Sequence, residues 1–191
     1  MKSTLVTAAL ALSIFCLGPN VRADEWNQQT QITFNQPVEI PGRVLLPGTY
    51  IFKLASSNSD RNIVEVYNDR QNHLYGIFLT IPDYRATPAG HVIVKFAETT
   101  SGSPDALSTW FYPGDNYGHE FVYPRSEAVR LAKSSNRPVP FISDEIANQP
   151  ATSMNDAGVA AMNQAHVKAM TPNGEEVECN TVFGRQTPVS H

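Results

Sequence analysis

Residues 39–54 read E-I-P-G-R-V-L-L-P-G-T-Y-I-F-K-L, with two Pro-Gly pairs set between short apolar runs. In the second pair, Pro47 fixes φ for the first central position of a turn. Gly48 is expected to supply the positive φ that a type II turn needs at the second position. From residue 49 to 54 the side chains alternate with the period of two that is typical of a strand with one buried face. The stretch therefore predicts an antiparallel β protein.

The chain up to residue 125 continues this pattern of short strands and turns. Residues 27–34 alternate between polar and apolar side chains, whereas residues 74–81 are apolar almost throughout and are expected to form the central strand. Helical stretches of about 10–15 residues do not separate these segments, so parallel βαβ units are not expected. We predict an all-β fold, either an antiparallel β-sandwich or a flattened barrel of about eight strands.

The first 23 residues have the pattern of a signal peptide. Lys2 supplies a positive charge, residues 5–17 are apolar, and Val21-Arg22-Ala23 fits a cleavage site. Cleavage near Ala23 predicts a secreted or periplasmic protein. The apolar run is shorter than the roughly 20 residues that cross a bilayer, and no other run approaches that length, so no membrane span is expected.

Cleavage would also change the charge and the cysteine content of the chain. It removes two of the 14 basic residues, Lys2 and Arg22, and none of the 18 acidic ones, so the net charge falls from −4 to −6. Without a basic block or a basic face, nucleic acid is not an expected partner. Loss of Cys16 leaves Cys179 as the only cysteine, which excludes an intrachain disulfide in the mature chain.

The predicted β domain, residues 24–125, is followed by a short helix over residues 126–136. Ser126 is a favourable N-cap, and a narrow apolar stripe at helical spacing follows it. The stripe comprises Ala128, Leu131 and Ala132. Residues 137–191 contain no Leu, Trp or Tyr and are rich in Pro, Asn, Gln, Ala, Ser and Thr. Such a segment buries too little apolar surface to offset its conformational entropy, so we expect a disordered, low-complexity tail.

The most unusual composition lies in residues 110–123, W-F-Y-P-G-D-N-Y-G-H-E-F-V-Y. Strand side chains alternate, so a Phe111 that faces the core would leave Trp110 and Tyr112 together on the other face. Exposed aromatic rings can stack on sugars or on apolar peptide side chains. The alternative is that the rings fill the core. The candidate binding residues are Trp110, Tyr112, Asp115, Tyr117, His119, Glu120 and Tyr123.

A catalytic interpretation of the same hairpin rests on Asp115, His119 and Glu120. Two carboxylates and an imidazole can act as acid and base or bind a metal. Their spacing matches neither a zinc motif nor an EF-hand, and the chain contains no G-x-S-x-G, P-loop or G-x-G-x-x-G motif. Neither a metal nor a cofactor is therefore predicted, and no residue is assigned as catalytic.

Three segments carry a resemblance to a known kind of protein: Asp24-Glu25-Trp26-Asn27, residues 38–50 with their V-E-I-P-G and L-P-G-T-Y motifs, and residues 110–116, W-F-Y-P-G-D-N. The chain resembles an uncharacterised family of small exported bacterial β-domain proteins over residues 24–125. The resemblance implies a compact exported β domain and no particular activity.

These observations favour a non-enzymatic exported β-sandwich module of the cell envelope or periplasm, which binds a protein or glycan partner or serves a structural role. The alternative is a hydrolase or metal-dependent enzyme that uses Asp115, His119 and Glu120. A third possibility is that the tail tethers the domain to a partner through residues 156–170. The sequence does not indicate an oligomeric state.

Overall fold

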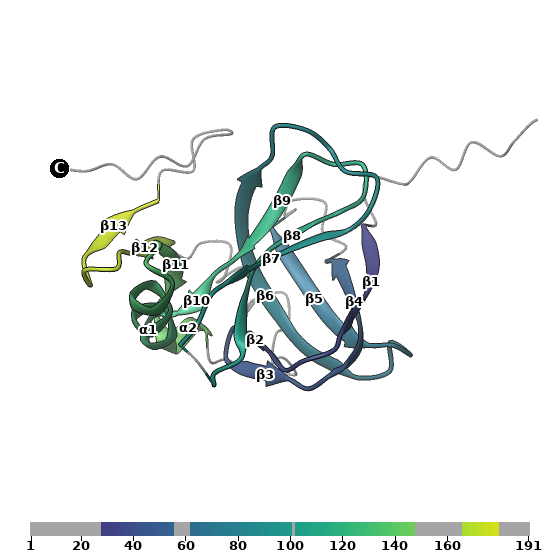
Figure 1. Cartoon of the computed structure of the whole chain (residues 1–191), viewed down its shortest axis with the longest axis horizontal. Helices are drawn as coiled ribbons and strands as arrows, with labels where there is room; N and C mark the ends of the chain where they lie inside the picture. Colours follow the sequence, from purple (N-terminus) through teal and green to yellow (C-terminus); the bar gives the residue numbers. More distant parts are fainter. Residues whose placement is uncertain (1–27, 56–61, 101, 148–165, 180–191) are drawn as a thin grey trace, which may run out of the picture.

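A computed structural model describes residues 28–55, 62–100, 102–147 and 166–179 (Figure 1). The expected signal peptide, residues 1–23, lies outside the described residues. Among the described residues, no helix is both long and apolar enough to cross a membrane.

The larger part of the fold is one sheet of nine strands. The strands are β1 (Gln29–Phe34), β2 (Val38–Ile40), β3 (Arg43–Leu45), β4 (Gly48–Leu54), β5 (Ile63–Asn68), β6 (Leu74–Tyr84), β7 (Ile93–Ala97), β8 (Asp105–Phe111) and β9 (Tyr117–Phe121). Their order is β1-β4-β5-β6-β9-β8-β2-β3, and β7 pairs with β8. Neighbouring strands are antiparallel except for β2 and β8, which run parallel. The prediction of an all-β fold is confirmed.

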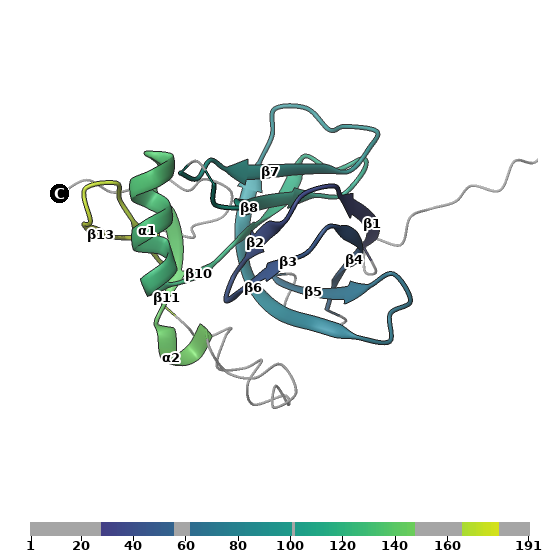
Figure 2. The same cartoon turned by 60° about the horizontal axis from the view of Figure 1, so that its bottom comes forward.

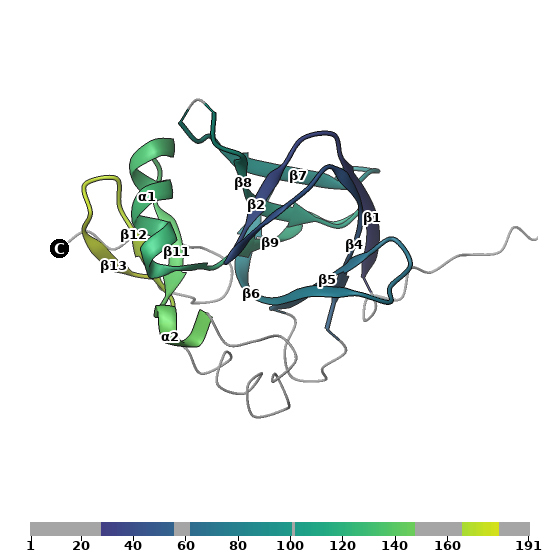
Figure 3. The same ribbon diagram turned by 90° about the horizontal axis from the view of Figure 1, so that it is seen from below.

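The sheet curls on itself as a flattened barrel (Figure 3). Among the described strands, β1 pairs only with β4 and β7 pairs only with β8, so the contacts of β1 with β7 and β8 across the interior are made by side chains. Trp110 on β8 donates its indole N–H to the hydroxyl of Thr30 on β1 over 2.9 Å. The rings of Phe34 on β1 and Phe96 on β7 meet edge to face with centroids 6.2 Å apart.

A smaller sheet and two helices follow the barrel. The elements are β10 (Tyr123–Pro124), α1 (Arg125–Ser135), β11 (Val139–Ile142), α2 (Asp144–Ala147), β12 (Lys168–Met170) and β13 (Glu176–Glu178). The sheet order is β10-β11-β12-β13. Strands β10 and β11 are parallel and joined by α1, which lies beside the small sheet (Figure 2). The structure thus contains one short βαβ unit, although the sequence indicated none.

The helix forms within one residue of its predicted bounds, and the expected stripe of Ala128, Leu131 and Ala132 is buried. Its start differs from the prediction, because Ser126 does not cap the helix. The Ser126 amide and hydroxyl instead both donate to Asp144 Oδ1 over 3.0 Å, which ties α1 to α2. Asn136 ends the helix in the left-handed conformation with φ of 53°.

The described part of the expected disordered tail differs from the prediction. Val139 and Phe141 on β11 and Met170 on β12 belong to the same buried cluster as Phe52 in the barrel. The segment has little apolar mass of its own, but the barrel and α1 offer apolar surface against which these side chains pack. Residues 148–165 and 180–191 lie outside the described residues.

The glycine with a positive φ lies in the first Pro-Gly turn and not in the second. Gly42 has φ of 75° and joins β2 to β3, where Ile40 pairs with Arg43. Gly48 does not have a positive φ; it begins β4 and pairs with Phe34 in ordinary strand geometry. The prediction of a type II turn at Gly48 is therefore wrong, and Pro41-Gly42 fits that turn instead.

We expect Gly42→Ala to lower the free energy of unfolding by about 1–2 kcal/mol, because a β-carbon is strained at positive φ. Gly48→Ala is the matched control, since an added β-carbon there meets nothing closer than 3.6 Å. Urea unfolding of both variants measures the difference. Equal midpoints for the two variants would contradict the assignment of the turn.

Candidate functional site

The hairpin of β8 and β9 sends its candidate residues to different places. Trp110 and His119 are paired across the two strands and face the barrel interior, where each is at most 1% exposed. Glu120 follows His119 directly, so its side chain lies on the outer face of the sheet. Asp115 lies in the connection between the strands. The three residues of the catalytic interpretation therefore do not converge.

Trp110 is a core residue and not a surface residue. Its ring packs against Phe52 with centroids 6.1 Å apart, and its indole N–H is satisfied by Thr30. The sequence left two alternatives for Trp110: a place in the core, or a place beside Tyr112 on the face opposite a buried Phe111. In the structure, Ser108 of β8 has no partner in β7, because Phe96 pairs with Leu107 and Lys95 with Thr109. This extra residue resets the alternation and turns Trp110 inward.

Phe111 packs on the outer face but is also fully buried. Its ring covers Gly118 on β9, where an added β-carbon would lie only 2.5 Å from the ring. Lys95 Nζ lies 4.8 Å and Arg85 Cζ 5.4 Å from the ring centroid, at distances suited to cation–π contact. The consecutive residues Trp110 and Phe111 are thus both buried, Trp110 in the barrel interior and Phe111 on the outer face of the sheet.

His119 belongs to a polar layer inside the barrel. Its Nδ1 lies 3.3 Å from the Thr80 hydroxyl on β6, and its ring lies between those of Trp110 and Tyr117. The ring centroids are 5.4 Å from Trp110 and 5.1 Å from Tyr117. Because the imidazole is buried between rings, it has no access to a substrate at the surface.

Tyr117 and Tyr84 form an aromatic pair at the end of the barrel where β6 stops and β9 starts. They are direct partners in the two strands, and their rings meet edge to face with centroids 5.5 Å apart. Tyr84 is 45% exposed, whereas Tyr117 is half-buried and donates its hydroxyl to Asn62 Oδ1 over 3.0 Å. We refer to Tyr84 and Tyr117 as the tyrosine rim. Fixed rings with one open face suit contact with a sugar or an apolar side chain.

The other candidate aromatics lie elsewhere. Tyr123 is 2% exposed, and its hydroxyl contacts the carbonyl oxygens of Leu107 at 2.8 Å and Glu39 at 3.3 Å. Burial raises the pKa of Tyr123 well above its ordinary value, so the hydroxyl stays protonated as a structural donor. Tyr112 is half-buried and packs against the main core.

Asp115 has a structural partner. Gln28 Nε2 donates to Asp115 Oδ2, which connects the residue before β1 to the loop between β8 and β9. This hydrogen bond joins the same two sides of the barrel as the contact between Trp110 and Thr30. The Asp115 carboxylate therefore serves to hold the loop in place.

Glu120 belongs to a charged cluster on the outer face of β6–β9–β8–β7. Asp83 Oδ2 accepts hydrogen bonds from Lys95 Nζ at 2.8 Å and from the Thr109 hydroxyl at 3.1 Å. Burial, reinforced by the nearby Asp83 carboxylate, raises the pKa of Glu120 to about 7, although Arg137 and Lys95 act in the opposite direction.

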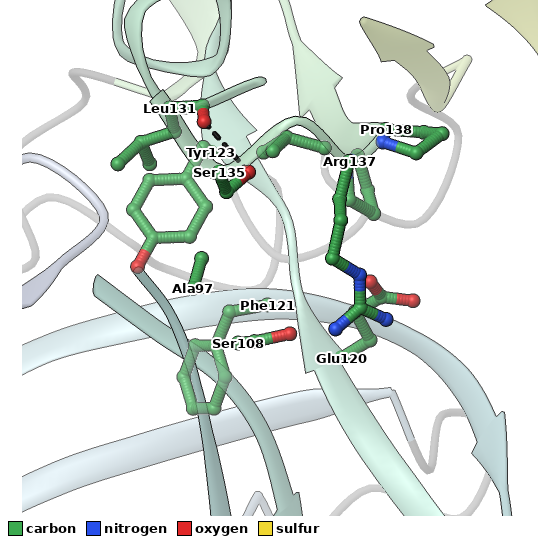
Figure 4. A pocket seen from close by; sticks show the side chains of 11 residues that line it. Ala97, Ser108, Glu120, Phe121, Tyr123, Leu131, Ser135, Arg137 and Pro138 are labelled. Carbon is green, nitrogen blue, oxygen red and sulfur yellow. Dashed lines mark hydrogen bonds between the residues drawn. The ribbon is translucent and has the colours of Figure 1, made fainter. Parts of the chain in front are cut away.

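A small cavity of about 30 Å³ separates this outer face from α1 and β11. Glu120, Ser108 and Ala97 line it from the barrel, and Arg137 and Ser135 line it from the opposite side. Figure 4 shows the Arg137 guanidinium directed towards the Glu120 carboxylate and the Ser135 hydroxyl bonded to the carbonyl of Leu131. The volume is far below the roughly 300–1,000 Å³ of small-molecule pockets, and it suits water.

Cys179, next to the end of β13, is near this cluster. Burial and the carboxylates of Glu120 and Glu178 raise the pKa of its thiol to about 11. The thiol is therefore protonated at neutral pH and is a poor nucleophile. Among the described residues, no three His, Cys, Asp or Glu side chains are arranged to hold a metal ion.

Comparison with known protein families, with curated proteins and with solved structures finds no match. Sequence reasoning selected Tyr117 and Glu120, which the structure places at a partly exposed rim and in a charged cluster. It missed Tyr84, Asp83 and Arg137, because their proximity to the hairpin depends on strand pairing and on the course of the chain after α1.

We expect Trp110→Ala to cost about 3–5 kcal/mol of unfolding free energy, because it leaves a cavity in the barrel interior. Thr30→Val should cost about 1–3 kcal/mol by leaving the buried indole N–H without an acceptor. Chemical denaturation followed by circular dichroism measures both values. A Trp110→Ala protein as stable as the parent would show that the ring is not part of the core.

Proposed function

We propose that the protein is an exported, non-enzymatic β module of the cell envelope or periplasm that binds a protein or glycan partner through its tyrosine rim. The observation that carries this proposal is the ring pair of Tyr84 and Tyr117, which is held by strand pairing and by the hydrogen bond to Asn62 yet keeps Tyr84 45% exposed. Export is inferred from the signal-like pattern of residues 1–23.

Preorganisation supports a binding role for the rim. Tyr117 is fixed by Asn62 and by the neighbouring His119 ring, so it loses little side-chain entropy when a partner binds. Tyr84 adds an accessible face and a hydroxyl, a combination that suits contact with the apolar face and the hydroxyl groups of a sugar or with a peptide. The enzyme alternative requires the side chains of Asp115, His119 and Glu120 to meet at one point. Instead, Asp115 bonds to Gln28 from a loop, His119 lies in the interior, and Glu120 lies on the outer face of the sheet.

The test uses the chain from residue 24 onward and two probes, insoluble cell-wall polysaccharide in a sedimentation assay and envelope proteins in chemical cross-linking. Tyr84→Ser should weaken binding about two- to tenfold, since an aromatic contact contributes about 0.5–1.5 kcal/mol. Tyr84→Phe should retain most of the affinity for a peptide but less for a sugar, because the hydroxyl is lost.

Val44→Ser is the control, because Val44 is similarly exposed, at 48%, but lies on β3, which β8 and β2 separate from β9 in the order of the sheet. Its binding should equal that of the parent protein. Full binding by a folded Tyr84→Ser protein would exclude the rim as the recognition surface, and loss of binding in a folded Val44→Ser protein alone would place that surface near β3.

A further inference from the structure

One cation on the outer face of the barrel has no acidic partner among the described residues. Lys95 forms an ion pair with Asp83, and the Arg137 guanidinium is directed towards Glu120 (Figure 4). Arg85, which follows β6 directly, belongs to none of the ion pairs that the described residues form. Its Nη1 is buried and meets no hydrogen-bond acceptor. A guanidinium that is partly withdrawn from water and left unpaired is unfavourable, so its surroundings favour an anion.

Arg85 is held in a fixed place. Its backbone amide donates to the carbonyl of Asn116 over 2.8 Å, which joins the end of β6 to the loop before β9. A second backbone hydrogen bond, from Gly114 to Ala89 over 2.7 Å, joins the loops that follow β6 and β8. The Arg85 guanidinium lies over the ring of the fully buried Phe111, with Cζ 5.4 Å from the ring centroid. Because backbone and ring contacts already restrain the side chain, it loses less entropy when a ligand binds.

The charges at the Phe111 ring do not balance. Lys95 Nζ and Arg85 Cζ both lie over this ring, and Asp83 neutralises only Lys95. Asp115, in the nearby loop, is bonded instead to the residue before β1. Water at Nη1 would satisfy the buried donor but would leave the positive charge in place. One uncompensated positive charge therefore remains on this part of the outer face.

We propose that Arg85 is the binding site for a carboxylate group of a ligand. The positive charge is shared by the three guanidinium nitrogens, so an anion that contacts Nε and Nη2 neutralises it although Nη1 is enclosed. Arg85 is partly exposed, which leaves the side chain accessible from solvent. A planar carboxylate matches the planar guanidinium and carries the one negative charge that is lacking. A doubly charged phosphate or sulfate would place an excess negative charge close to Asp83.

This site is separate from the tyrosine rim. Arg85 lies over Phe111 on the outer face of the sheet, whereas Tyr117 shares its side of β9 with the interior residue His119. The proposal therefore does not rest on the function proposed for the rim, and each can fail without the other.

The test uses acetate as the probe at about pH 7, with the chain from residue 24 onward. The NMR signals of the Gly114 and Gly118 amides report binding, because Gly114 lies in the loop beside Arg85 and Gly118 lies under the Phe111 ring. When acetate replaces chloride at constant ionic strength, their chemical shifts should saturate with a Kd on the order of 10 mM, as expected for one charge-assisted contact. Acetamide, which has a similar shape and no charge, should cause no saturable shift.

Arg85→Gln should weaken acetate binding roughly tenfold or more, because it removes the charge. Arg85→Lys keeps the charge but loses the planar donor pair, so binding should weaken about threefold. Arg70→Gln is the matched control and should bind like the parent, since Arg70 is an exposed cation in the turn before β6, at the other end of that strand.

Parental acetate affinity in a folded Arg85→Gln protein would overturn the proposal, and if that protein does not fold, parental affinity in Arg85→Lys would do so. Sulfate that binds much more tightly than acetate would overturn the assignment of a carboxylate. Neither result bears on the tyrosine rim, which the Tyr84 variants test.

Discussion

The hydrogen bond from the Trp110 indole to Thr30 is the contact on which the barrel most depends. Among the described strands, β1 pairs through its backbone only with β4, so its contact with β8 relies on side chains. Trp110 is fully buried in the interior and brings its one polar atom to an acceptor. The rings of Phe52 and His119 pack against it, and the position of His119 in turn places Tyr117 and the tyrosine rim.

Successive side chains of β9 point to opposite faces of the sheet, so neighbouring residues lie in chemically different surroundings. His119 lies in the ring-lined interior, and Glu120, one residue later, lies beside Asp83, Lys95 and Arg137 on the outer face. Residues that are adjacent in the sequence therefore belong to different parts of the protein. The tyrosine rim and the charged cluster around Glu120 lie on opposite sides of the same strand, so each can be altered by mutation without the other.

The sequence predicted the parts of the structure that depend on local pattern. Alternation in β1 and β4 and the apolar stripe of α1 were sufficient to identify a β domain followed by a short helix. Two features depend on partners that local pattern does not reveal. The extra residue Ser108 turns Trp110 inward only because of how β7 pairs with β8, and β11 is ordered by a core that the preceding residues build.

The site was predicted less well than the fold, for the same reason. Tyr117 and Glu120 could be selected from their chemistry, whereas Tyr84 joins Tyr117 only through the pairing of β6 with β9.

The contribution of β12 to the core also bears on how the protein folds. Met170 contacts a cluster that includes Ile32, so native contacts extend across most of the chain. A chain that emerges with its N-terminus first cannot complete this core until residue 170 is available, and such long-range contacts favour slow folding with a late final step.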